Sequence, residues 1–119
     1  MPREIVILSP SPPDAQALLR AGVAIDDTLR VRTLYNGSVH ELCRGDGDGD
    51  TAVLSVYQPQ DVSNPGEVQR LLPDAPSMPQ PLWWIEAFAP WGEQGDLGVR
   101  LAYELSAQLG GACLVQDGE

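Results

Sequence analysis

The stretch Leu82–Pro90, LWWIEAFAP, decides how this chain folds. Eight residues dominated by aromatic and aliphatic side chains, closed by a proline, predict a β-strand. Side chains alternate between the two faces of a strand, so this stretch presents two different surfaces. One surface carries no charge and is expected to pack under helices: Trp83, Ile85, Ala87 and Ala89. The other is expected on the open face of a sheet: Leu82, Trp84, Glu86 and Phe88.

Five further strands are predicted on either side of this stretch. Leu29–Tyr35 alternates apolar with polar residues, as a half-buried strand does. Asn36-Gly37 follows it directly and is a strong hairpin signal, because both turn positions adopt positive φ. The return strand, a third strand of the meander and one strand near each end of the chain are expected at Val39–Cys43, Ala52–Tyr57, Ile5–Leu8 and Ala112–Val115.

Two amphipathic helices and one short helix are predicted between these strands. The first is expected to have Ser11 as its N-cap and to end at Gly22, since these are common residues at helix starts and stops. A short helix at Ser63–Leu72 precedes the proline-rich connector Pro73–Pro81. The last helix has Asp96 as its expected N-cap and carries a leucine at every fourth position: Leu97, Leu101, Leu105 and Leu109.

This order of elements predicts a single α+β domain over residues 1–119. Two βα units flank a central antiparallel meander. We therefore expect a ferredoxin-like two-layer sandwich, with a mostly antiparallel sheet of about five to six strands, two main helices and one short helix. A fold of this kind indicates no particular activity.

The charge of the chain indicates which classes of binding partner it suits. Seventeen acidic and seven basic residues among 119 leave a formal net charge of −10, and all seven bases are arginines. Such a surface repels phosphate backbones and disfavours nucleic acid, while it suits a basic protein partner. The cysteines, Cys43 and Cys113, follow no metal or disulfide spacing and are expected to be free thiols. No apolar run reaches the length of a membrane span, so we expect a cytoplasmic protein that does not bind membranes.

The acidic glycine stretch Arg44–Asp50, RGDGDGD, partly resembles a calcium-binding loop. Three aspartates match the first ligand positions of an EF-hand. However, Thr51 stands where glycine is needed, and Tyr57 stands where a bidentate glutamate is needed. We therefore expect a polar turn between two strands, which presents charge to a partner.

Catalytic and metal-binding motifs are weak. His40 is the one histidine, and it points away from Cys43 on a regular strand, so the two are not expected to share a metal. The glycines between Trp91 and Leu101 match neither the P-loop nor the dinucleotide-binding fingerprint. Their neighbours Glu93 and Asp96 would also repel a phosphate group. We predict no catalytic residue, no metal and no cofactor. The alternative is a catalytic site formed by residues that are distant in sequence and close only in the fold.

The aromatic face of the Leu82–Pro90 strand is the strongest candidate for a binding surface. Trp and Arg are enriched in interface hot spots, and two arginines are expected on the same face. The alternative is that the short helix or the proline-rich connector covers this face and makes Trp84 part of the core. The predicted partner-binding residues are Trp84, Glu86, Phe88, Trp91, Arg30 and Arg32.

Two classes of function fit these observations. The first is a small acidic binding protein without catalytic activity, which contacts either its own copy as a homodimer or a basic partner. In its acidity, small size and lack of lysine the chain resembles immunity proteins that neutralise bacterial toxins, and this implies inhibition of a basic toxin. The alternative is a small-ligand enzyme or sensor with a pocket formed by Trp84, Glu86, Arg32 and His40.

Overall fold

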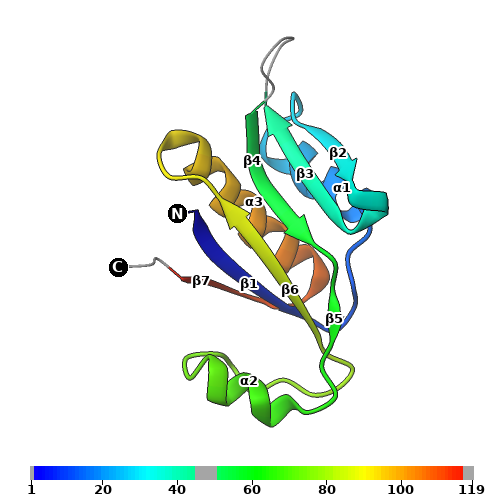
Figure 1. The fold of residues 1–119 in the computed structure, drawn as a ribbon, viewed down its shortest axis with the longest axis vertical. Coiled ribbons are helices and arrows are strands. Elements are labelled where there is room, and N and C mark those ends of the chain that lie inside the picture. The colour runs from blue at the N-terminus through cyan, green and yellow to red at the C-terminus, as the bar shows by residue number, and fades with distance from the viewer. Residues whose placement is uncertain (1, 45–50, 117–119) are drawn as a thin grey trace.

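A computed structural model describes residues 2–44 and 51–116 of the chain (Figure 1). The acidic glycine stretch 45–50, predicted as a polar turn, lies outside the described residues. The elements follow in the order β1 (Arg3–Ser9), α1 (Ala15–Ile25), β2 (Arg30–Leu34), β3 (Val39–Arg44), β4 (Thr51–Tyr57), β5 (Gln60–Asp61), α2 (Pro65–Leu71), β6 (Trp83–Ala89), α3 (Glu93–Leu109) and β7 (Ala112–Gln116).

The strands form one seven-stranded sheet in the order β2-β3-β4-β6-β1-β7, with β5 paired to the start of β6. Each pairing between the described strands is antiparallel. The predicted α+β class, antiparallel sheet and three helices are therefore confirmed. The predicted strand count is slightly low, because β5 is two polar residues long and has no recognisable pattern.

β6 lies in the middle of this sheet. It pairs with β1 along its whole length, from Ser9 opposite Trp83 to Arg3 opposite Ala89. On its other side β4 pairs with its second half and β5 with its beginning. Because β6 has partner strands on both sides, it joins β1 and β7 to the β2-β3-β4 part of the sheet.

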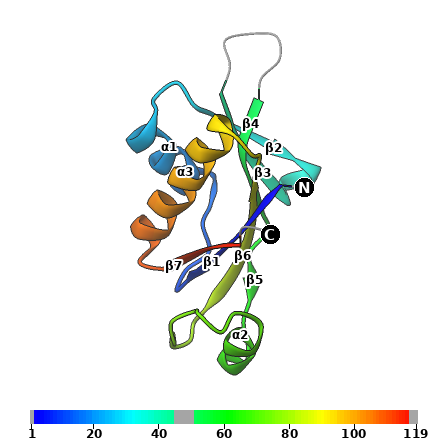
Figure 2. The same ribbon diagram turned by 90° about the vertical axis from the view of Figure 1, so that its left-hand side faces the viewer.

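The main core lies between the sheet and helices α1 and α3, which are on the same side of it (Figure 2). The uncharged side of β6 faces this core as predicted, since Ile85, Ala87 and Ala89 are fully buried and Trp83 packs against them. The helices contribute their apolar stripes to the same cluster, principally Ala17, Leu18, Ala21, Leu97, Leu101, Ala102 and Leu105.

A second, smaller core lies on the opposite face of the sheet. There α2 and the chain that follows it pack against one end of β1 and β6. The buried members are Val6, Leu8, Val68, Leu72, Ala75 and Leu82. The short helix thus covers part of the face that was expected to be open, and β1 is buried on both sides.

Several helix boundaries differ from the prediction. Asp14, not Ser11, caps α1, because its carboxylate accepts a hydrogen bond from the Ala17 N–H at 2.8 Å. The helix also continues past Gly22, which is buried against Leu42. α3 begins at Glu93 after Gly92, so Asp96 lies within its first turn and does not cap it.

The glycines of α3 allow the helix to approach the sheet closely. A β-bulge in β4 leaves Val53 without a partner residue on β3, since Leu42 pairs with Leu54 and Cys43 with Ala52. A Cβ atom on Gly98 would overlap the Val53 carbonyl oxygen, and one on Gly95 would overlap the Pro90 carbonyl oxygen. These glycines, considered in the sequence as a phosphate cradle, are buried packing positions.

Replacing Gly98 with alanine should therefore destabilise the protein by roughly 2 kcal/mol, because the methyl group forces the helix away from the sheet. At an ordinary helix position the same change stabilises by about 1 kcal/mol, so the expected sign is reversed. Urea unfolding measures the difference. Gln94→Ala, at an exposed site on the same helix, serves as the control and should change stability by less than about 0.5 kcal/mol. A Gly98→Ala protein more stable than the parent would contradict this packing.

Candidate functional site

Three side chains of β6 lie on the face of the sheet that turns away from α1 and α3. Trp84 and Phe88 are half-buried, and Glu86 between them is exposed. α2 reaches only the Trp84 end, where that indole packs against the second core. Trp84 therefore lies at the boundary between the covered and the uncovered part of this face. It is partly a core residue and partly exposed, so each of the two predicted alternatives holds for one part of its side chain.

Tyr57 of β4 extends the aromatic surface toward the neighbouring strand. Its ring meets the Phe88 ring edge to face, with centroids 5.3 Å apart and an interplanar angle of 77°. Tyr57 is 45% exposed. Only the pairing of β4 with β6 brings the two rings together, so Tyr57 is not among the partner-binding residues predicted from the sequence.

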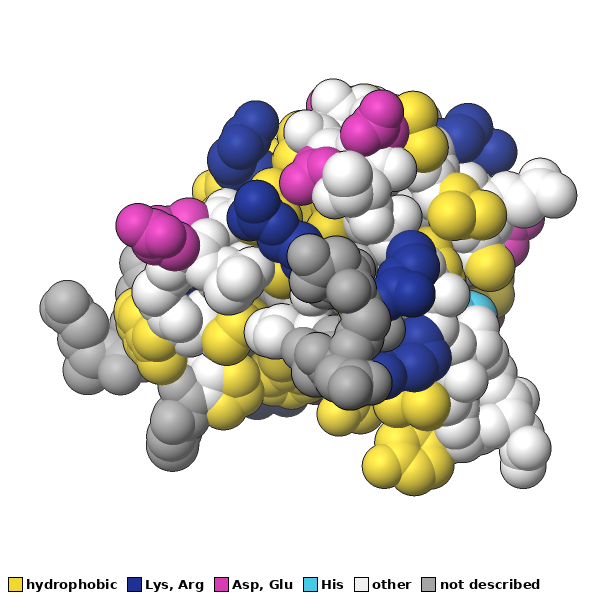
Figure 3. Space-filling model, turned by 90° about the horizontal axis from the view of Figure 1, so that it is seen from above, with side chains coloured by type: hydrophobic (Ala, Val, Ile, Leu, Met, Phe, Trp, Pro, Cys, Tyr) yellow, Lys and Arg dark blue, Asp and Glu magenta, His cyan; other side chains and the backbone are white. Residues whose placement is uncertain are grey.

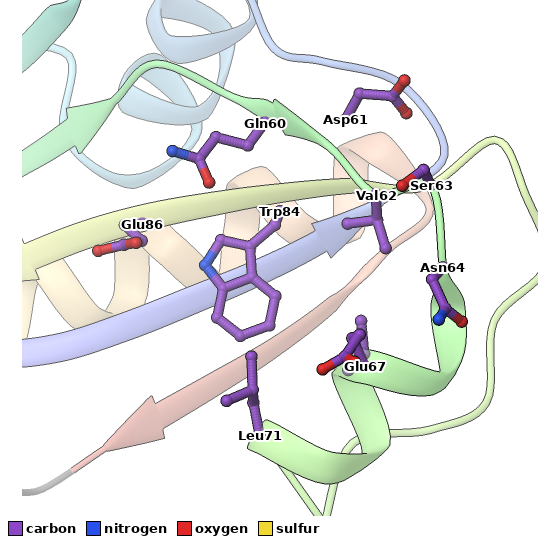
Figure 4. Close-up of a pocket in the computed structure, with 10 residues that line it drawn as sticks. Gln60, Asp61, Val62, Ser63, Asn64, Glu67, Leu71, Trp84 and Glu86 are labelled. Atoms are coloured by element: carbon purple, nitrogen blue, oxygen red, sulfur yellow. The ribbon is translucent and has the colours of Figure 1, made fainter.

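A groove of about 350 Å³ separates α2 from the sheet, and the Trp84 side chain projects into it toward Leu71 (Figure 4). We call this hollow the Trp84 groove. Strand β5, β6 and α2 supply its principal side chains, which are Gln60, Asp61, Glu67, Leu71, Trp84 and Glu86.

Two further hollows meet the Trp84 groove at Trp84 and Glu86. One, of about 400 Å³, extends toward Tyr35 and Tyr57. The other, of about 250 Å³, extends toward β7 and includes Glu4. The surface is therefore a trough with an aromatic centre, and Trp84 and Glu86 border all three of its parts.

The charge of this trough is negative. Glu67 and Glu86 line the Trp84 groove and Glu4 lines the hollow beside it, whereas no arginine is among the described lining residues. Asp61 lies at the rim with its carboxylate directed away from Trp84 (Figure 4). Glu67 forms an exposed ion pair with Arg70 at 2.6 Å, so its charge is partly balanced. At the opposite end of the molecule arginine and acidic side chains lie next to one another (Figure 3).

The predicted arginines do not join Trp84. Arg30 and Arg32 lie on β2, the edge strand, with β3 and β4 between them and β6. Arg32 and Glu41 are cross-strand partners, and the guanidinium contacts that carboxylate at 2.6 Å. At the usual strand spacing β2 and β6 are about 14 Å apart, so these arginines belong to a separate part of the same face.

Trp91 is also separate, because it follows the far end of β6. The Arg3 guanidinium lies over its indole ring at 5.0 Å from the centroid. The same guanidinium contacts Asp96 at 2.8 Å and donates to the Gly92 carbonyl oxygen at 3.0 Å. Arg3, which the sequence analysis did not single out, thus connects β1 to the start of α3.

His40 lies on the other face of the sheet. Its cross-strand partner Val56 is buried in the main core, and its Nδ1 is 2.9 Å from the Thr33 hydroxyl oxygen. The pocket predicted from Trp84, Glu86, Arg32 and His40 is consequently not assembled. The alternation of side chains along β3 separates the histidine, and two intervening strands separate the arginine.

The residues available for metal or thiol chemistry are scattered. Within residues 2–44 and 51–116, no three His, Cys, Asp or Glu side chains gather as metal ligands do. Cys43 is buried, and burial raises the pKa of the Cys113 thiol to about 11. A high pKa leaves the thiol in its unreactive form. Among the described helices none is long and apolar enough to cross a membrane.

Cys113 should therefore react slowly with iodoacetamide in the folded protein. At pH 8 a thiol of pKa about 11 is roughly a hundredfold less ionised than the same thiol in the unfolded chain, so alkylation should be slower by about that factor. Mass spectrometry of the Cys113 peptide gives the rate in buffer and in urea. Equal rates in the two conditions would contradict the burial of this thiol.

The chain was compared with protein-family models, curated proteins and solved structures, and none of them matches it. A function for the chain must therefore be argued from the geometry of the trough and from its charge.

Proposed function

We propose that this chain is a small acidic binding protein, which contacts a protein partner through the uncovered part of its sheet. The observation that carries the proposal is the exposed aromatic trough around Trp84. Large aromatic side chains left half-exposed beside a groove are typical of interaction surfaces, because their burial against a partner releases water from apolar area.

The charge of the chain favours a basic partner. The net charge of −10 and the carboxylates beside Trp84 attract a cationic surface and speed its capture. One version of this function is an immunity-type inhibitor, which would neutralise a basic toxin by binding it. The other version is a homodimer formed through the same face, which like charges make less favourable.

We also infer that the sheet is an elaborated ferredoxin-like arrangement. The neighbouring strands β4, β6, β1 and β7, together with helices that follow β1 and β6 on one side, support this inference. In this view β2 and β3 extend the sheet beyond β4. Helix α2 is an insertion that covers part of the sheet face opposite α1 and α3.

A pull-down from the native host tests the proposed function. The parent protein should capture a specific protein that Trp84→Ala and Glu86→Arg both lose, since the first removes the aromatic centre and the second reverses its charge. Glu86 is exposed, so its replacement leaves the core unchanged. Tyr103→Ala, at an exposed site on α3, is the control and should retain the partner.

Capture of the same protein by both face variants would refute the proposed surface. Sedimentation of the purified chain separates the two versions. A monomer that captures a basic protein supports the inhibitor, whereas a dimer that Glu86→Arg dissociates supports self-association through this face.

A further inference from the structure

We propose that the Trp84 groove is a receptor for one arginine side chain, carried by an extended basic segment of the partner protein. This inference rests on the proposed function and names the chemical group that the surface recognises. The guanidinium would lie over the indole of Trp84 and pair with the carboxylate of Glu86.

The chain itself contains a complete example of this interaction. At the far end of β6 the Arg3 guanidinium covers the ring of Trp91 at 5.0 Å and contacts the Asp96 carboxylate at 2.8 Å. An indole face attracts a cation through its quadrupole, and a nearby carboxylate adds a charge-assisted hydrogen bond. Guanidinium, indole and carboxylate thus form a matched set around Trp91.

Around Trp84 the indole and a carboxylate are present, but the described lining residues supply no guanidinium. Glu86 lies two residues along the same strand, about 7 Å away at the usual rise, and on the same face. Glu67 lines the α2 side of the groove and is paired with Arg70, while the described lining residues include no arginine. The groove is therefore complementary in charge to a cationic side chain that comes from another molecule.

The shape of the surface favours an extended segment over a free small cation. The Trp84 groove continues into two hollows that share Trp84 and Glu86 and that run across the sheet in both directions. Apolar or aromatic side chains line each part: Leu71 in the groove, Tyr57 on one side and Leu72 on the other. An extended segment with apolar residues two positions before and two positions after its arginine would place all three side chains on one side, so that the apolar ones fill the hollows while the arginine reaches the indole.

Arginine fits this site better than lysine does. Its planar guanidinium stacks on an indole and is more weakly hydrated than an ammonium group, so it loses less on leaving water. The half-buried position of Trp84 strengthens this preference, since one side of the indole is already packed against the second core.

An acetylated and amidated peptide, Val-Ser-Arg-Ser-Val, serves as the probe because its extended form presents both valines and the arginine on one side, and its citrulline analogue is the neutral control. Citrulline keeps the shape of arginine but lacks its charge. NMR titration of the intact chain follows the indole N–H signals of Trp83, Trp84 and Trp91, which single Trp→Phe variants assign. We expect the Trp84 signal to shift saturably with the arginine peptide and to stay in place with the citrulline peptide.

Two variants make the test specific. Trp84→Leu should abolish binding, and Glu86→Gln should weaken it roughly tenfold through loss of one charged contact. Glu104→Gln, on α3 and away from this face, removes the same charge elsewhere and should leave the affinity within about twofold. Because Glu86 is exposed, its variant keeps the test valid even if Trp84→Leu fails to fold.

Equal binding of the citrulline peptide, or a shift confined to Trp91, would overturn the inference. If the peptide fails to bind while capture of the host partner still depends on Trp84 and Glu86, the arginine receptor is wrong and the proposed function stands. If the peptide binds at Trp84 while the captured partner ignores both variants, the receptor stands and the proposed function is wrong.

Discussion

The antiparallel pairing of β1 with β6 is the constraint on which the rest of the structure depends. β1 is short and apolar, and Ile5 to Ser9 are all buried. Its odd-numbered residues Ile5 and Ile7 face the main core, while Val6 and Leu8 face the second core. A strand buried on both faces requires cover on both faces, so this pairing explains why the protein has helices on either side of its sheet.

The candidate site exists because helices cover the two faces of the sheet to different extents. α1 and α3 cover the first face broadly, and the glycines of α3 bring it into backbone contact with β4 and the end of β6. α2 is seven residues long and reaches only one end of the second face. Trp84 therefore has one side in a core and one side in a groove, which is the arrangement that makes an aromatic side chain available to a partner.

Two tryptophans of the chain, Trp84 and Trp91, lie next to carboxylates, but they differ in whether an arginine covers the ring. Trp91 has a cation from β1 over its ring, so its interaction is satisfied within the chain. Trp84 has Glu86 on its own strand and Glu67 on α2 as acidic neighbours. Glu67 is paired with Arg70, and the described residues that line the groove include no arginine. An acidic, lysine-free chain that leaves such a site open is suited to a partner that brings the positive charge.

Much of the local structure could be predicted, because it depends on short-range periodicity. The alternation in β6 separated its buried side from its exposed side, and the leucines of α3 identified its buried stripe. Capping residues were predicted less well. Ser11 and Asp14 are both good caps, and Asp14 is the one used because Pro13 disfavours helical backbone at Pro12, directly after Ser11.

The class of fold, the two faces of each strand and the negative charge of the surface could all be predicted, since these follow from residue type and from neighbours along the chain. Tertiary structure alone decided which strands lie side by side. That order places Tyr57 next to Phe88 and puts two strands between Arg32 and Trp84. The packing of α2 then covers one end of the face on which Trp84 lies. Contacts between distant segments depend on how whole elements pack, and no local pattern records that choice.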